Sequence, residues 1–213
     1  MAERDRLEYF NAKGRAEATR MLYAIAGEDF HDIRHDNRQW QTIRATVEMP
    51  LGQIPTLKTK DGILCLSNTM ARYVAKKFGL VGEGLWNETL NDLIVEVLQE
   101  FVNNYSANYI YWKFLKRTPE PENSDKIVEN IRSDLLKRLD YIRSISEKRG
   151  NPKFLLADKI QLADVWLYTI LEFAKLGFPD AMEITPWTKE FTSAYEADPK
   201  ISAYLAKRPQ TPM

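Results

Sequence analysis

The stretch from Pro50 to Leu80 constrains the fold of this chain more than any other part of the sequence. It predicts a β-hairpin in which one strand begins at Ile54-Pro55, the chain turns at Lys60-Asp61-Gly62, and a second strand runs from Ile63 to Leu66. A helix must follow at once, because apolar residues at helical spacing begin directly after the second strand. These residues are Met70, Tyr73, Val74 and Phe78, and Gly79 can end the helix.

The hairpin and its helix can together hold a small peptide. The residue before Pro55 offers a backbone N–H and C=O, and the positive N-terminus of the helix attracts a carboxylate. A side chain of Ser67 or Asn68 is expected to cap the first turn of this helix. An edge-strand proline and an ordinary helix cap would explain the same residues without a ligand.

Composition bounds the class of protein. The chain has 213 residues with 30 basic and 30 acidic side chains, a balance that favours neither nucleic acid nor an anionic membrane as a general partner. No apolar run approaches the ~20 residues of a membrane span, and the charged N-terminus lacks the apolar core of a signal peptide, so we expect a cytoplasmic protein. The lone Cys65 excludes an internal disulfide and a multi-cysteine metal site, and we predict no metal.

A glycine-dense link at residues 79–84 predicts a boundary between domains 1–80 and 85–213. Before the link, a strand at Leu7–Phe10, a helix at Arg15–Gly27 and a strand at Phe30–Arg34 precede the hairpin and its helix. The order βαβ followed by ββα predicts an α/β N-terminal domain with the thioredoxin-like fold. This domain has 13 basic and 10 acidic residues, which suits an anionic ligand.

The second domain is predicted to be an all-α helical bundle. The first long helix carries an apolar stripe of Leu90, Leu93, Ile94, Val97, Leu98 and Phe101, and the second carries Ile127, Ile131, Leu135, Leu139 and Ile142. An apolar segment from Phe154 to Ala174 and two shorter helices, around Trp187–Ala197 and Lys200–Lys207, complete the domain.

Several segments resemble the sigma class of the cytosolic glutathione transferases. They are the Gln53-Ile54-Pro55 motif with the helix that starts at Ser67, the opening Leu7–Arg20 with its Tyr-Phe and Gly-Arg-Ala-Glu motifs, Trp40 with Arg44, and the ending Leu205–Pro209. The resemblance covers nearly the whole chain. It implies a cytosolic homodimer that conjugates glutathione, its co-substrate, to small hydrophobic electrophiles in detoxification.

The resemblance implies that Tyr9 and Arg15 are catalytic. A thiol of pKa ~8.5 is only about 3% thiolate at pH 7, and lowering that pKa by ~2 units makes most of it nucleophilic. The Tyr9 hydroxyl would donate a hydrogen bond to the sulfur anion, and Arg15 would lie near the sulfur. The residues alone leave open that Tyr9 packs in a core and that Arg15 forms a structural ion pair.

The resemblance also implies a set of glutathione contacts. The implied residues are Tyr9, Trp40, Arg44, Gln53, Ile54, Pro55, Ser67 and Glu100. Trp40, Arg44 and Gln53 would hold the glycine end, although Arg44 also fits a solvated surface charge. Ile54, before a Pro55 expected to be cis, would pair its backbone with the cysteinyl unit. Ser67 would bind the γ-glutamyl carboxylate, and Glu100 or its neighbour Gln99 would reach the γ-glutamyl amine in the other subunit.

The electrophile site is expected between the two halves of the chain, on the loop after the first strand and on the first long helix. Its candidate residues are Asn11, Lys13, Val102, Tyr105, Ser106 and Tyr109.

The chain departs from the class at three places. Leu66 replaces a Gln or Glu that contacts the γ-glutamyl group, and the loop from Trp40 to Gln53 is longer than the class norm. Gln161 replaces the Ser or Thr of a capping box with Asp164, so we expect a weaker helix start, by about 1 kcal/mol. Three functions therefore compete: a general transferase, a prostaglandin D synthase-type isomerase, and a crystallin-like relative with weak activity.

Overall fold

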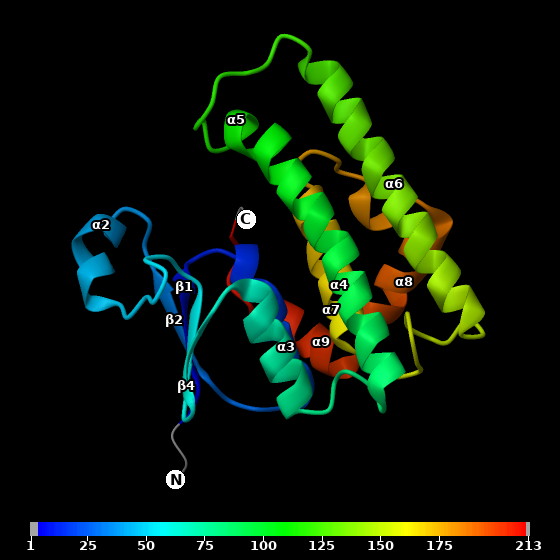
Figure 1. Cartoon of the computed structure of the whole chain (residues 1–213), viewed down its shortest axis with the longest axis horizontal. Helices are drawn as coiled ribbons and strands as arrows, with labels where there is room; N and C mark the ends of the chain where they lie inside the picture. Colours follow the sequence, from blue (N-terminus) through cyan, green and yellow to red (C-terminus); the bar gives the residue numbers. More distant parts are fainter. Residues whose placement is uncertain (1–3, 212–213) are drawn as a thin grey trace. The chain divides into compact units, whose positions relative to one another are not determined.

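The computed structural model describes residues 4–211. The chain forms two compact units: the first takes the chain up to Val81 and again from Tyr195 on, and the second runs from Gly82 to Ala194. The break between Val81 and Gly82 falls inside the glycine-dense link. The segment from Tyr195 on, which the sequence prediction assigned to the helical domain, belongs instead to the first unit (Figure 1).

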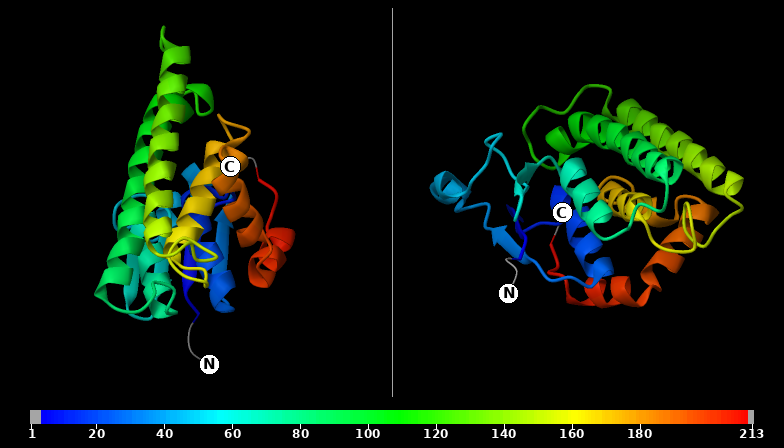
Figure 2. Two further views of the ribbon diagram at one scale, coloured as in Figure 1. Left: turned by 90° about the vertical axis from the view of Figure 1, so that its right-hand side faces the viewer. Right: turned by 60° about the horizontal axis from the view of Figure 1, so that its bottom comes forward.

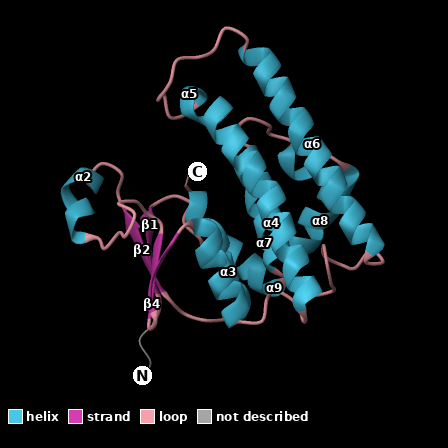
Figure 3. Ribbon diagram, viewed as in Figure 1, coloured by secondary structure: helices cyan, strands magenta, loops and turns pink. Residues whose placement is uncertain are grey.

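The first unit is a four-stranded mixed sheet with helices, in the predicted thioredoxin-like order. Its elements are β1 (Arg6–Phe10), η1 (Gly14–Ala16), α1 (Glu17–Ala26), β2 (His31–His35), α2 (Trp40–Ile43), η2 (Arg44–Thr46), β3 (Thr56–Thr59), β4 (Gly62–Cys65), α3 (Ser67–Lys77) and α9 (Pro199–Lys207). The strand order is β2-β1-β3-β4, with β1 parallel to β2 and antiparallel to β3. Helices α1 and α3 lie on the same side of the sheet (Figure 3).

The core of this unit follows from the apolar pattern of the sequence. Leu7 of β1 pairs in register with Leu57 of β3, and both side chains are fully buried. Helix α1 buries Met21 and Leu22 and ends at Gly27, whose φ of 75° favours glycine. The sheet and α1 therefore share one apolar layer.

The start of α3 differs from the prediction. The N-cap residue is Leu66, with φ 69° and ψ 118°, and no side chain caps the helix there, so the expected cap by Ser67 or Asn68 is wrong. The reason is that β4 ends at Cys65, which leaves a single residue to turn the chain into the helix. Ser67 is already the first helical residue, and its hydroxyl lies 3.5 Å from Asn68 Oδ1.

Helix α9 belongs with the first unit because its side chains bind α1. Lys200 Nζ donates to the Ile25 carbonyl, and Tyr204 and Arg208 contact Glu17. The two helices lie side by side in both views of Figure 2. These contacts join segments more than 170 positions apart, which no local sequence pattern reports.

The second unit is helical, as predicted. Its elements are α4 (Leu85–Tyr105), a π-helical turn η3 (Ser106–Ile110), α5 (Tyr111–Lys113), α6 (Ser124–Lys148), α7 (Leu162–Ala174), η4 (Ala181–Glu183) and α8 (Pro186–Glu196), which crosses into the first unit at its end. Helix α4 packs against both α6 and α7. Its predicted stripe is buried at Leu90, Ile94, Leu98 and Phe101, whereas Leu93 stays 36% exposed. None of the described helices is both long and apolar enough to cross a membrane.

A buried polar cluster fixes the start of α7. The carboxylate of Asp164 accepts the N–H groups of Gln161 at 2.7 Å and Leu155 at 2.8 Å. The capping box is present all the same, because the Gln161 side chain takes the place of the missing hydroxyl towards the N–H of Asp164. Helix α4 adds a further acceptor, since Asn91 Oδ1 accepts the N–H of Ala163 at 2.9 Å. Asn91 also donates to the Gln161 side chain at 2.7 Å. The first turn of α7 thus has an acceptor far away in the sequence in addition to its own capping box.

We predict that Asp164 makes folding stability depend on pH. Burial raises the pKa of Asp164 to about 7, although the N–H donors of Leu155 and Gln161 oppose this rise. Below about pH 4 the carboxyl is neutral in both the folded and unfolded states. Between about pH 4 and pH 7 only the unfolded state is ionised, so the free energy of unfolding falls by about 1.4 kcal/mol per pH unit as pH rises.

Chemical denaturation of the wild type and of Asp164→Asn across this pH range isolates the effect, because the amide does not titrate. The difference in unfolding free energy between the two proteins should change between pH 4 and pH 7 and level off above. A difference that stays constant over the whole range would contradict the prediction.

Candidate active site

Tyr9 lies near the end of β1, half-buried, beside the turn that leads into η1. Its phenolic oxygen accepts the backbone N–H of Arg15 at 3.3 Å. Because the oxygen is the acceptor in this bond, the hydrogen of the Tyr9 hydroxyl remains available for donation to another group.

Gly14 holds the loop against Tyr9. Its φ is 41°, and a Cβ at this position would lie 2.8 Å from the Tyr9 hydroxyl oxygen and 3.0 Å from Cε1 of the ring. Real Cβ atoms do not approach so closely, so a larger residue would displace either the loop or the ring. The position of Tyr9 therefore depends on the loop after β1.

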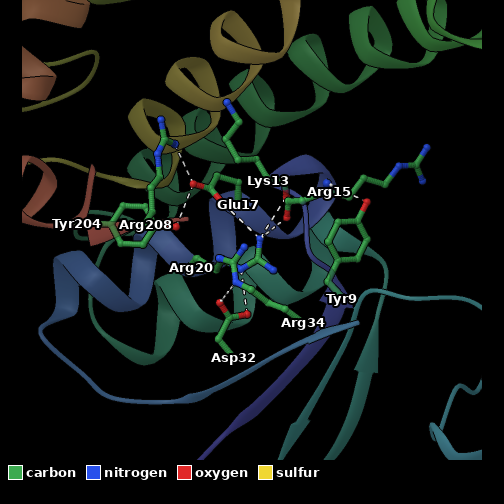
Figure 4. A network of polar contacts seen from close by, with 10 residues as sticks. Tyr9, Lys13, Arg15, Glu17, Arg20, Asp32, Arg34, Tyr204 and Arg208 are labelled. Atoms are coloured by element: carbon green, nitrogen blue, oxygen red, sulfur yellow. Dashed lines mark hydrogen bonds and ion pairs between the residues drawn. The ribbon is translucent and has the colours of Figure 1, made fainter. Parts of the chain in front are cut away.

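Arg15 contacts Tyr9 through its backbone N–H and not through its charged side chain. The Arg15 side chain is exposed and extends away from the Tyr9 ring in Figure 4. The two electrophile-site candidates on the same loop are Asn11, which is exposed, and Lys13, which is half-buried.

The residues expected at the glycine end are only partly brought together. The Trp40 ring packs edge-on against Phe10, with 5.2 Å between centroids, and lies 5.5 Å from the His35 ring. His35 Nε2 in turn lies 2.6 Å from Glu8 Oε2. Arg44 is exposed and donates to the side chain of Gln41 at 3.4 Å.

Gln53, Ile54 and Pro55 precede β3, and the Ile54–Pro55 peptide bond is cis, as expected. Gln53 is exposed, and the Ile54 backbone makes no hydrogen bond to the described residues.

Leu66, at the start of α3, is 52% exposed, and Ser67 is half-buried. The start of α3 thus carries an accessible apolar side chain next to a hydroxyl and to uncapped backbone N–H groups.

In the second unit, Glu100 has a partner on α6, and Gln99 has one within α4. Arg138 Nη1 lies 3.0 Å from the Glu100 carboxylate, whose side chain is 73% exposed. Gln99 donates to Asn103 at 2.9 Å.

The four electrophile-site candidates of the second unit, Val102, Tyr105, Ser106 and Tyr109, are all buried. The Tyr105 hydroxyl donates to the Ala174 carbonyl at 3.3 Å, and its ring stacks on Tyr109 with 5.4 Å between centroids. Burial raises the pKa of both tyrosines above the ordinary value, so both hydroxyls remain protonated. Ser106 and Tyr109 belong to the π-helical turn, a geometry that often accompanies functional sites.

Sequence reasoning missed a group of charged residues behind Tyr9. Glu17 and Arg20 are almost fully buried on α1, where Arg20 pairs with Asp32 of β2 and Glu17 contacts Tyr204 of α9 and Arg208, the residue after α9 (Figure 4). Glu17 and Arg20 lie beside the apolar face of α1 rather than on it, and a pattern of apolar residues treats such positions as solvent-facing. The local signals of this group are the two charges next to an apolar helix face and the Gly-Arg-Ala-Glu motif, which includes Glu17.

Two further features bear on the kind of chemistry. Within the part of the chain that the structure describes, no three His, Cys, Asp or Glu side chains are grouped so that they could hold a metal ion. A pocket of about 260 Å³ lies in the second unit, lined by Leu136, Leu139, Asp140, Arg143, Thr185 and Trp187. It contains none of the residues expected to bind glutathione or an electrophile.

Comparison with known proteins gives matches along nearly the whole chain. A family model described as glutathione S-transferase, C-terminal domain, matches residues 106–208. Glutathione S-transferase 3 of Caenorhabditis elegans is 31% identical over 97% of this chain and 97% of its own. S-crystallin 4 of Enteroctopus dofleini is 28% identical over 96% of this chain and 97% of its own. Hematopoietic prostaglandin D synthase of Gallus gallus is 29% identical over 97% of each chain.

The fold is also found among solved structures. A monomeric glutathione S-transferase of the human hookworm parasite Necator americanus superimposes with a TM-score of 0.85. It is 24% identical, and the match covers 99% of this chain and 100% of the hookworm chain. At this identity the likeness concerns the fold.

Proposed function

This chain belongs to the glutathione S-transferase family, whose co-substrate is glutathione, and we propose from that premise that Tyr9 activates the glutathione thiol. The observation that carries this proposal is the hydrogen bond from the Arg15 N–H to the Tyr9 oxygen at 3.3 Å. A phenol that accepts one bond becomes a stronger donor through its own hydrogen, because the two bonds polarise each other.

The Tyr9 hydroxyl would donate to the sulfur anion and so favour ionisation of the thiol near neutral pH. The thiol proton would pass to solvent. The thiolate would then attack an electrophilic carbon, forming a C–S bond while the leaving group departs with its electron pair. Arg15 would contribute through its amide, and its exposed side chain is free to turn towards bound glutathione.

The backbone around Ile54 and α3 supports binding of the peptide. Glutathione has a peptide unit that can pair with the N–H and C=O of Ile54, which no described residue occupies. The α3 N-terminus has no side-chain cap and begins with Ser67, so it can accept the γ-glutamyl carboxylate. Trp40, Arg44 and Gln53 would contact the glycine end, and Glu100 would act on the ligand of a second subunit.

We assign the chain to the sigma class and to a detoxifying role in the cytoplasm. The opening motif around Tyr9 and the prostaglandin D synthase relative support this class. The electrophile would contact Asn11, Lys13, Val102, Tyr105, Ser106 and Tyr109. An isomerase of the prostaglandin D synthase type is the alternative that this relative favours. The S-crystallin relative, together with Leu66, favours a protein of weak activity.

We predict that Tyr9→Phe lowers turnover with little change in glutathione binding. The ring keeps its packing against Gly14, while the one donor to the thiolate is lost, so the cost falls on the reactive anion. The measurement is the ultraviolet absorbance of the bound thiolate against pH. Tyr73→Phe is the matched control, because that hydroxyl lies 3.5 Å from Asp61 and outside the proposed site. An apparent thiol pKa that is the same in wild type and Tyr9→Phe would rule out Tyr9 as the activator.

We predict that Leu66→Gln lowers the Michaelis constant for glutathione and leaves the maximal rate nearly unchanged. Leu66 is 52% exposed and cannot bond the γ-glutamyl group, and a missing bond to a charged group weakens binding by roughly 10 to 150-fold. Steady-state kinetics with a chloronitrobenzene substrate will test this, with Leu85→Gln as the control at another exposed leucine. No wild-type turnover at saturating glutathione would favour the crystallin-like function, and unchanged constants in Leu66→Gln would remove residue 66 from the site.

We predict a homodimer in solution. Helices α4 and α6 keep Leu93, Leu136 and Tyr141 between 36% and 47% exposed, an apolar surface that a second copy would cover. Sedimentation velocity at micromolar concentration measures the assembly state. A stable monomer, like the hookworm relative, would reject both the dimer and the shared role of Glu100.

A further inference from the structure

Arg20 lies at the centre of the charged group behind Tyr9 and is fully buried. Its Nη1 donates to the carbonyl of Ala12 at 2.7 Å and lies 3.4 Å from the carbonyl of Lys13. Its Nε donates to Asp32 Oδ1 at 3.0 Å, and Nη1 also lies 3.4 Å from Glu17 Oε2. One guanidinium therefore holds both the loop after β1 and two carboxylates.

Each of the two carboxylates has further partners besides Arg20. Glu17 Oε1 accepts the Tyr204 hydroxyl and Arg208 Nη1 of the C-terminal segment, both at 2.9 Å. Asp32 Oδ2 accepts Arg34 Nε at 2.7 Å within β2. Figure 4 shows these side chains converging on Arg20 from α1, β2 and the C-terminal segment.

The loop after β1 links Arg20 to Tyr9. The carbonyls of Ala12 and Lys13 belong to the same short loop as Gly14, whose backbone packs on the Tyr9 ring. The next residue, Arg15, supplies the N–H that bonds the Tyr9 oxygen. The Arg20 guanidinium also lies 6.0 Å from the centre of the Tyr9 ring, at the outer limit of a cation–π contact. A displacement of Arg20 would therefore move both groups that orient the Tyr9 hydroxyl.

We propose that Arg20 is a positioning residue for thiol activation, held in place from the C-terminal segment by Tyr204 and Arg208 through Glu17. This inference rests on the proposed function, because it assumes that Tyr9 donates to the glutathione thiolate. Arg20 is buried behind the loop and touches the reacting atoms only through that loop and the Tyr9 ring. Its removal should thus affect the thiol more than the affinity for glutathione.

A guanidinium is needed because its nitrogens are fixed in one plane and can serve the loop and both carboxylates together. A lysine ammonium at the end of a flexible stem keeps the charge but cannot reproduce that geometry. At the other end, Tyr204 stays a donor, since burial and the Glu17 carboxylate raise the pKa of its hydroxyl above the ordinary value.

The experiment compares Arg20→Lys and Tyr204→Phe with the wild type in two measurements. The first is the pH dependence of the bound-thiolate absorbance, and the second is kcat and KM for glutathione. Arg20→Lys should raise the apparent thiol pKa by about 1 unit and lower kcat/KM about tenfold near neutral pH, with KM nearly unchanged. Tyr204→Phe, which keeps its ring, should raise the apparent thiol pKa by about 0.5 unit and lower kcat/KM by about threefold.

Arg132→Lys is the matched control, since Arg132 forms a two-bond ion pair with Asp180 in the second unit and does not contact the loop. It should lower the melting temperature without moving the thiol pKa. If Arg20→Lys does not fold, Tyr204→Phe carries the test alone.

The outcomes separate the two hypotheses. A wild-type thiolate band that both variants leave unshifted, with lower melting temperatures only, would overturn the positioning role and leave the proposed function intact. A wild type that shows no bound thiolate at neutral pH would overturn the proposed function, and the positioning role with it.

Discussion

The pairing of Arg20 with Glu17 and Asp32 is the constraint on which the first unit depends. A buried charge is costly unless it is paired, and the loss of one partner leaves the others uncompensated. Arg20 and Glu17 lie on α1, and their partners come from β2, the loop after β1 and the C-terminal segment, so the charges can be satisfied only when all four parts are in place. The need to pair these charges also fixes the position of Tyr9, because the loop after β1 contacts both Arg20 and Tyr9.

Much of this fold could be predicted because it rests on local patterns. The apolar face of α1, the glycine that ends it, the hairpin before α3 and the long stripes of α4 and α6 all have a period or a turn signal. The start of α3 could not be predicted in the same way, because Leu66 adopts a positive φ that leucine rarely takes. The leucine side chain gives no indication of that conformation. It is imposed because only one residue lies between the end of β4 and the start of α3.

The candidate site was harder to predict than the fold for a related reason. Tyr9, Ile54 and Ser67 belong to recognisable motifs. The structural role of Glu17 and Arg20 instead depends on contacts with residues elsewhere in the sequence, which are Asp32, Tyr204 and Arg208. Asn91 illustrates the same limit in the second unit. The start of α7 lacks a hydroxyl, and beside the Gln161 side chain a further acceptor for its first turn comes from a different helix. A departure from a family motif can therefore be compensated at a residue that the motif does not include.

The return of the chain from Tyr195 on to the first unit has a consequence for the order of biosynthesis. Domains generally fold as units while the chain is being made, with the N-terminal part first. Here the first unit cannot close when its sheet leaves the ribosome, because α9 is then still unsynthesised. Glu17 and the carbonyl of Ile25 remain exposed to water until the whole helical unit and the C-terminal segment that supplies their partners have been translated. The helical unit is thus the first that can be completed, although it comes second in the sequence.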